Sequence, residues 1–194
     1  MTNPAAAPAA STRDRLLDAA VELFYREGVH VGVEALCRAA GVSKRSMYQL
    51  FDSKDELVAA SLERRAPGHA AALLPAADDG RSARERILHV FRSLEGLAAD
   101  PQFRGCPYVA AAVELKAPDH PAHLVARHHK DALTSFFRRE ATRGGAADPA
   151  LLARQLTVAF DGSSAWGVVQ AHPLDGLAVS TAATLLDAAG VRDV

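Results

Sequence analysis

The hydrophobic residues of the chain recur at intervals of three and four positions, with polar residues between them. This period places apolar side chains on one side of an α-helix, whereas a half-buried strand would need strict alternation. No convincing alternating stretch and no repeat is present. Glycine, proline and capping residues separate nine such segments. The pattern therefore predicts an all-α fold, a nine-helix bundle in two domains.

Residues 33–51 contain two short segments of this kind, separated by a tight turn. The apolar residues of the first segment share one helical face: Val33, Leu36, Cys37 and Ala40. Gly41 follows at the position where a left-handed residue would end the helix. After the turn, the hydroxyl of Ser43 can cap a second helix. This arrangement is typical of a helix-turn-helix unit.

The second helix of this unit has two chemically different sides. Met47, Leu50 and Phe51 share the apolar side. The other side offers cations, a phenol and an amide: Lys44, Arg45, Tyr48 and Gln49. Cations can contact DNA phosphates, while arginine and amide groups can read base edges in the major groove. We therefore predict that this side binds DNA, as the second helix of such units does.

Turn signals divide the chain into four predicted parts. Residues 1–11 are rich in alanine and proline and are expected to be a disordered tail. Residues 12–65 form the expected DNA-binding domain, and residues 66–81 a linker or helix extension. Because Pro67 disfavours a helix interior, the last helix of the DNA-binding domain should end near Arg65. Residues 82–194 are the expected ligand-binding and dimerisation domain.

Composition narrows the class of protein without giving a function. Of the 194 residues, 49% are hydrophobic and 23% charged, which suits a folded chain with a real core. No apolar run reaches the ~18 residues of a membrane span, and the N-terminus lacks the features of a signal peptide. We therefore expect a cytoplasmic protein. Cys37 and Cys106 are expected to be small buried hydrophobic residues, without a disulfide.

The net charge of −1 does not by itself indicate a nucleic-acid partner. The local distribution is more informative. Between residues 38 and 54, Asp52 is the only acid, and the cations are Arg38, Lys44, Arg45 and Lys54. The acids that balance these cations lie elsewhere in the sequence and need not approach DNA.

Three motifs follow one another between residues 12 and 62: LLDAAVELFYREG, ALCRAAGVSKRSMYQLF and SKDELV. Together they resemble the N-terminal domain of the TetR/AcrR family of bacterial transcriptional regulators. Residues 103–172, with RGCPYVAAAVEL and a later Asp-Gly, resemble the ligand-binding half of some members less specifically. The resemblance implies a homodimer that binds a palindromic double-stranded DNA operator. Most members are repressors that a small-molecule effector, bound in the C-terminal bundle, releases from DNA.

The resemblance also assigns DNA contacts position by position. Tyr48 matches an aromatic residue that touches phosphate, Lys54 matches a phosphate-binding lysine, and Gln49 matches a variable position that often faces bases. The start of the recognition helix is matched by Ser43, Lys44, Arg45 and Ser46.

The sequence departs from the family pattern at two places. Gly32 stands where members usually have a hydroxyl residue that caps the helix and binds phosphate, so this contact is not expected here. Arg45 replaces a small residue, which makes it the best candidate for reading guanine through O6 and N7.

Candidate effector-binding residues lie in the C-terminal half, although each also suits a helical core. Asp161 stands in an apolar helix, where a carboxylate needs a partner. It can bond a neighbouring helix, with Arg127 or His128 as candidates, or cross a dimer interface, or face a ligand. The full candidate set is Phe91, Tyr108, Glu114, Arg127, Phe137, Asp161 and Trp166. Their chemistry suggests a mainly apolar or aromatic molecule.

Residues 151–186 are too apolar and too rich in small residues for a solvent-facing surface, so the last two helices are expected to form the homodimer. No cofactor or metal is expected, because the histidines do not share a face: His120, His123, His128 and His129. Two alternatives remain. One is a DNA-binding adaptor controlled by a protein partner, and the other is a helical enzyme with a Glu114/Asp161 site.

Overall fold

The computed structural model describes residues 10–77 and 79–192, and these residues form nine α-helices and no strand. The all-α prediction is confirmed. The expected disordered tail falls almost entirely on residues 1–9, outside the described residues. The helices are α1 (Thr12–Glu27), α2 (Val33–Ala40), α3 (Lys44–Leu50), α4 (Lys54–Leu73), α5 (Ala83–Ala98), α6 (Pro107–Leu115), α7 (Pro121–Arg143), α8 (Pro149–Gln170) and α9 (Leu177–Ala188).

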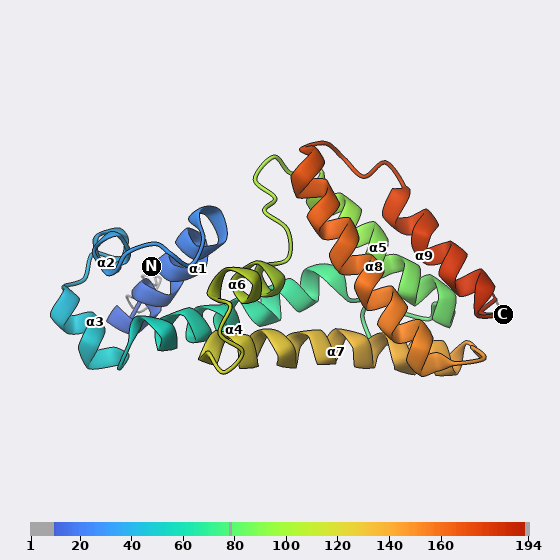
Figure 1. Ribbon diagram of the computed structural model, residues 1–194, viewed down its shortest axis with the longest axis horizontal. Coiled ribbons are helices and arrows are strands. Elements are labelled where there is room, and N and C mark those ends of the chain that lie inside the picture. Colours follow the sequence, from blue (N-terminus) through green and yellow to red (C-terminus); the bar gives the residue numbers. More distant parts are fainter. Residues whose placement is uncertain (1–9, 78, 193–194) are drawn as a thin grey trace, which may run out of the picture.

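The helices form two groups joined lengthwise. Figure 1 shows α1, α2 and α3 at one end of the molecule, and α5, α8 and α9 at the other. The long helices α4 and α7 run between the two groups and pack against each other, and α7 also packs against α6 and α8. Among the described residues, none of the helices combines the length and the apolar character needed to cross a membrane.

Serine side chains fix the starts of several helices. The hydroxyl oxygens of Ser11, Ser53 and Ser82 accept hydrogen bonds from backbone N–H groups three residues later, at 3.0, 3.1 and 3.2 Å. Each bond satisfies a donor that the first turn of a helix leaves unpaired. Local sequence chemistry thus sets where α1, α4 and α5 begin.

The end of α4 differs from the prediction. The helix does not end near Arg65 but continues through Pro67 to Leu73. Proline inside a helix costs about 3 kcal/mol, because its ring clashes with the preceding turn and a hydrogen bond is lost. The second half of α4 packs against α7, and Leu73 is buried in the C-terminal core. This tertiary packing offsets the local cost, which the sequence pattern alone did not show.

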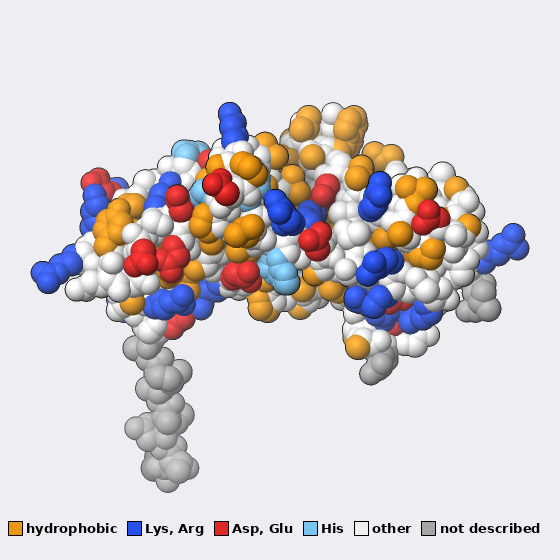
Figure 2. All heavy atoms as spheres, turned by 60° about the horizontal axis from the view of Figure 1, so that its bottom comes forward, with side chains coloured by type: hydrophobic (Ala, Val, Ile, Leu, Met, Phe, Trp, Pro, Cys, Tyr) orange, Lys and Arg blue, Asp and Glu red, His pale blue; other side chains and the backbone are white. Residues whose placement is uncertain are grey.

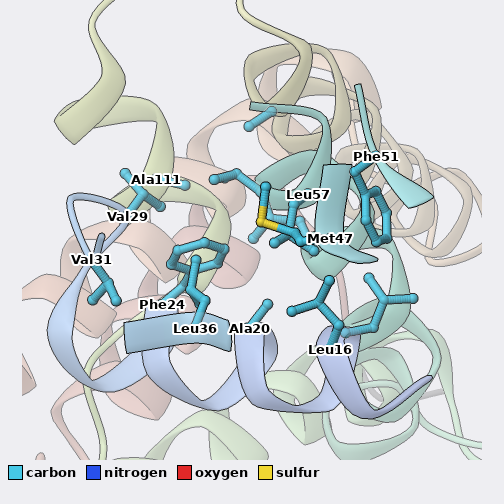
Figure 3. Close-up of a cluster of buried hydrophobic side chains, with 14 of the residues drawn as sticks. Leu16, Ala20, Phe24, Val29, Val31, Leu36, Met47, Phe51, Leu57 and Ala111 are labelled. Carbon is cyan, nitrogen blue, oxygen red and sulfur yellow. The ribbon is translucent and has the colours of Figure 1, made fainter. Parts of the chain in front are cut away.

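The end of the molecule that carries α3 has a core that reaches into the C-terminal half. Figure 3 shows Leu16, Ala20 and Leu36 meeting Met47 and Leu57 around one centre. Residues of α6 and α7 belong to the same cluster: Tyr108, Ala111, Ala122 and Ala126. The end that carries α3 is therefore held by continuous hydrophobic packing, as well as by the chain connection through α4.

The C-terminal core contains a buried charged network beside its apolar residues. The Arg86 guanidinium on α5 donates to Glu140 of α7 at 3.0 Å and to Asp79 at 2.9 Å. It also donates to the Ala76 carbonyl oxygen at 2.6 Å. A buried charge needs such partners. The network fixes the segment between α4 and α5 against the rest of the bundle.

Candidate nucleic-acid interface

Helix α3 buries one side and exposes the other. Met47 is completely buried and Phe51 is 2% exposed, whereas Tyr48 is 48% exposed. The other predicted contact residues in the first turns of α3 are also exposed, except for the half-buried Ser46: Ser43, Lys44, Arg45 and Gln49. The two sides inferred from the sequence are therefore present in the structure.

The start of α3 is capped by a side chain. The Ser43 hydroxyl accepts a hydrogen bond from the Ser46 N–H at 3.0 Å, and the two hydroxyl oxygens lie 2.8 Å apart. Gly41, just before, adopts the left-handed conformation with φ 63°. This glycine permits the tight turn at low cost, because it has no Cβ to clash. The turn sets the direction of α3 relative to α2.

The cations of α3 have no acidic neighbour that would neutralise them. Lys44 and Arg45 lie in its first turn, where the helix dipole disfavours positive charge. Neither residue, nor Lys54 at the start of α4, takes part in the ion pairs between described residues. Figure 2 shows basic side chains projecting at the end of the molecule formed by α2 and α3. These charges are available to an external polyanion.

Contacts that the sequence pattern did not reveal hold α1 beneath this surface. The Arg64 guanidinium on α4 donates to Asp18 at 2.6 Å and to Asp14 at 2.9 Å, both on α1. Hydrogen bonding from Ser11 and the nearby Arg64 cation lower the pKa of the Asp14 carboxyl. The Arg13 guanidinium lies 5.0 Å from the centre of the Phe51 ring. Arg13 therefore packs on Phe51 at the end of α3.

Glu114 lies where α6 meets the loop between α1 and α2, and it does not line a cavity with Tyr108. Its carboxylate accepts hydrogen bonds from the backbone N–H groups of Val29 and His30, at 3.0 and 2.8 Å. The His30 Nδ1 atom lies 3.0 Å from the same carboxylate. Because these residues connect α1 to α2, Glu114 fixes the loop that precedes the helix-turn-helix unit.

A cavity of about 270 Å³ lies between α4, α6, α7 and α8. Of the predicted effector-binding residues, only Tyr108 lines it. Phe91 and Phe137 are completely buried in the C-terminal core and do not line this cavity. Arg127 is exposed outside the cavity, and Trp166 is 48% exposed on α8. Periodicity alone could not separate core-facing aromatic residues from cavity-facing ones.

Asp161 forms an ion pair with Lys130 of α7, and not with Arg127 or His128 as proposed from the sequence. Burial raises the pKa of the Asp161 carboxyl, an effect that the Lys130 ammonium partly offsets. Lys130 also lies 5.0 Å from the centre of the Phe160 ring. The sequence signal, a carboxylate in an apolar helix, correctly indicated a bonded partner, but the partner depends on the relative rotation of α7 and α8.

Comparison with known proteins agrees with this architecture. Residues 16–61 match the profile of bacterial regulatory proteins of the tetR family. A crystal structure of a TetR-type transcriptional regulator from Streptomyces avermitilis is 60% identical and has a TM-score of 0.91, covering 94% of this chain and 100% of that one. The chain belongs to the TetR family. This degree of identity over 94% of this chain extends the relationship beyond the helix-turn-helix segment.

More distant relatives agree on the fold of this TetR-family chain. The transcriptional regulator YjdC of Escherichia coli is 27% identical over 85 residues, which is 44% of this chain and 44% of YjdC. The chain thus matches less than half the length of that curated relative. The TetR-family regulator CifR, solved with a 26-base-pair operator DNA, has a TM-score of 0.76 at 22% identity, covering 94% of this chain and 99% of CifR. At that identity, the likeness to CifR concerns the fold.

Several residues of this TetR-family protein gain importance only from the structure. His69, Lys130 and Arg139 line the cavity from α4 and α7, together with the aromatic ring of Phe160. His69 follows Pro67, where the sequence pattern placed a linker, and therefore was not a candidate. A helical reading extended past Pro67 would have placed Ala66, His69, Ala70 and Leu73 on one face.

Proposed function

We propose that this TetR-family protein is a dimeric transcriptional regulator that binds a palindromic operator through α3. The observation that carries the proposal is the exposed side of α3, where unpaired cations accompany Tyr48 and Gln49. Lys44, Tyr48 and Lys54 contact phosphates, and Arg45 and Gln49 read base edges in the major groove. The DNA complex of the similarly folded CifR supports this mode of binding.

We further propose that a mainly apolar or aromatic small molecule in the cavity releases the protein from DNA, so that it acts as a repressor. Helix α4 supports the coupling, since it lines the cavity with Ala70 and Leu73 and carries Lys54 at its other end. A ligand shifts the equilibrium only if it binds the DNA-competent and released states with different affinity. Operator DNA must then weaken ligand binding by the same factor.

The exposed side of α8 supports the proposed dimer. Val158 and Val169 are 72% and 76% exposed, and Leu151, Ala165 and Trp166 are also exposed on this helix. Leu151, Val158, Ala165 and Val169 fall within about 20° of one direction around the helix, given 100° per residue. An apolar stripe of this length marks an interface, and a two-fold dimer presents two α3 helices to two half-sites.

The test is a gel-shift measurement with the full chain and the DNA upstream of its own gene. We expect a shifted complex whose affinity falls linearly with salt on logarithmic axes, because phosphate contacts release counterions. A scrambled DNA of the same length and composition is the control, and it should bind more weakly. Equal affinity for both DNAs, or no binding at low salt, would overturn the proposed operator recognition.

A further inference from the structure

The cavity between α4, α6, α7 and α8 has strongly apolar walls and a defined size. Leu73, Leu133, Phe136 and Phe160 are among the residues that line it. An engineered apolar cavity of ~150 Å³ holds one benzene molecule. The cavity of about 270 Å³ therefore has room for about two fused rings or an apolar chain of similar volume.

The charged groups around this cavity are unbalanced. Lys130 and Arg139 line it, and none of the described lining residues is an aspartate or a glutamate. Lys130 is already paired with Asp161. Arg139, by contrast, takes part in none of the ion pairs between described residues. One cation at the cavity is thus without an acidic partner.

The protonation of the other polar groups is consistent with a positive potential in the cavity. Burial, together with the nearby Arg65, Lys130 and His129, lowers the pKa of His69 to about 4. His69 is therefore neutral near pH 7. Burial raises the pKa of the Tyr108 phenol, which stays protonated. The ring of His129 stacks on Tyr108 with centroids 4.6 Å apart. Neither His69 nor Tyr108 supplies the negative charge that would balance Arg139.

Lys130 and Arg139 are separated along α7. Nine residues of helix correspond to about 13 Å along the axis, so the two cations lie far apart on the cavity wall. Lys130 is half-buried and paired with Asp161, whereas Arg139 is exposed. A ligand can therefore place rings between the aromatic side chains and an anionic group at Arg139.

We propose that the effector is an aromatic carboxylate of up to about two rings, bound with its carboxylate at Arg139 and its rings toward Tyr108 and Phe160. The inference rests on the proposed function and adds the charge and the orientation of the effector. Arginine suits this role because its planar guanidinium can hold a carboxylate through two parallel hydrogen bonds.

The test compares naphthoate with naphthylmethanol, a neutral molecule of similar shape, by isothermal titration calorimetry on the full chain. We expect naphthoate to bind at least about tenfold more tightly, the size of one charge-assisted hydrogen bond. In Arg139→Ala this preference should disappear, because the carboxylate of naphthoate then has no cation to bind. In Arg138→Ala it should persist, since Arg138 is exposed on the same helix but does not line the cavity.

Three results would overturn the inference: equal affinity for the two probes, an unchanged preference in Arg139→Ala, or no binding of either probe. A gel shift on the same preparations, without probe, separates this inference from the proposed function. Loss of DNA binding with an intact, Arg139-dependent preference for naphthoate would contradict the operator proposal and leave the cavity assignment standing. Normal DNA binding with no preference would contradict only the effector chemistry.

Discussion

Arg45 and Lys54 are both cations on the proposed DNA-binding surface, but they differ in position. Arg45 lies in the first turn of α3 and is exposed, whereas Lys54 is half-buried at the start of α4, beside the Ser53 cap. A side chain on the outer side of α3 can enter the major groove. In the proposed complex, a side chain at the start of α4 approaches the DNA backbone instead. The two positions should therefore contribute differently to affinity and to sequence preference.

Replacing Arg45 by alanine should reduce sequence preference, while replacing Lys54 by alanine should weaken binding to all DNA. We expect Arg45→Ala to cost about 1–3 kcal/mol of discrimination at one base pair. We expect Lys54→Ala to reduce the salt-dependence slope by about one. Gel shifts with operator and scrambled DNA at several salt concentrations measure both effects. Arg138→Ala, far from α3, is the control, and wild-type behaviour of both variants would mean that α3 is not the reading helix.

His69 gives a pH dependence whose sign follows from its environment. Its pKa falls from 6.5 to about 4, first because of burial and then because of neighbouring cations. Between these two values the unfolded chain binds a proton at this residue and the folded chain does not. The contribution of His69 to the free energy of unfolding is therefore lost as the pH falls from 6.5 toward 4.

We expect His69→Asn to flatten this acid-side decline. Between about pH 7 and about pH 5, the free energy of unfolding should fall by about 1–2 kcal/mol more in the wild type than in the variant. Urea denaturation at the two pH values provides the measurement. His172→Asn serves as the control, because His172 is exposed at the end of α8. An equal decline in wild type and His69→Asn would show that His69 is not held neutral.

The short helices α2 and α3 illustrate how capping decides local stability. Ser43 caps α3 with its hydroxyl, whereas α2 begins at Gly32 without a side-chain cap. The φ of Gly32 is −73°, which other residues also adopt, and a Cβ added there would meet nothing within 4 Å. Gly32 therefore provides no side-chain cap, and sterically the position does not require glycine.

Gly32→Ser should stabilise α2 and also strengthen DNA binding. We expect a gain of a few tenths of a kcal/mol in the free energy of unfolding, the usual difference between glycine and serine caps. The added hydroxyl also restores the phosphate contact that the family resemblance implies. Ser43→Ala is the opposing variant, expected to lose about 1 kcal/mol. Thermal denaturation and gel shifts measure the two effects, and a destabilised Gly32→Ser would contradict this view of the cap.

At the scale of the whole molecule, α3 lies at one end and α8 at the other (Figure 1). The cavity is lined mainly from α4 and α7, and the apolar stripe lies on α8. A regulator needs all three, because effector binding must alter how two linked reading helices fit DNA. The apolar stripe is therefore as necessary to the proposed mechanism as α3.

A charge placed on the α8 stripe should produce a monomer. We expect Val158→Glu to sediment as a monomer at micromolar concentration, because it would bury an unpaired carboxylate in the interface. Operator affinity should fall by about 100-fold or more, since the two half-sites would no longer be bound by one linked molecule. Leu124→Glu on α7, where the leucine is 56% exposed, is the matched control. A wild-type protein that sediments as a monomer would contradict the dimer itself.

Much of the DNA-binding surface could be predicted from the sequence because its determinants are local. The two sides of α3 follow from the period of the helix, and its start follows from Ser43. The turn before it follows from the left-handed Gly41. All these features depend on residues within one or two turns of each other, so the amino-acid order contains them directly.

The cavity and the ionic contacts could not be predicted in the same way. The pairing of Asp161 with Lys130, and the bonds from Glu114 to Val29 and His30, join residues far apart in the sequence. Which cation pairs with which carboxylate depends on how adjacent helices are rotated and shifted. Periodicity does not distinguish between the candidates, because several charged residues on each helix fit it equally well.

The helical character, most helix boundaries and the chemistry of α3 could be predicted from the amino-acid order, because propensity, capping and periodicity act over a few residues. By contrast, the continuation of α4 past Pro67, the cavity shared by His69 and Arg139, and the burial of Phe91 and Phe137 depend on the folded arrangement. Packing between distant segments outweighs local preferences of a few kcal/mol, and this packing is set by the whole fold.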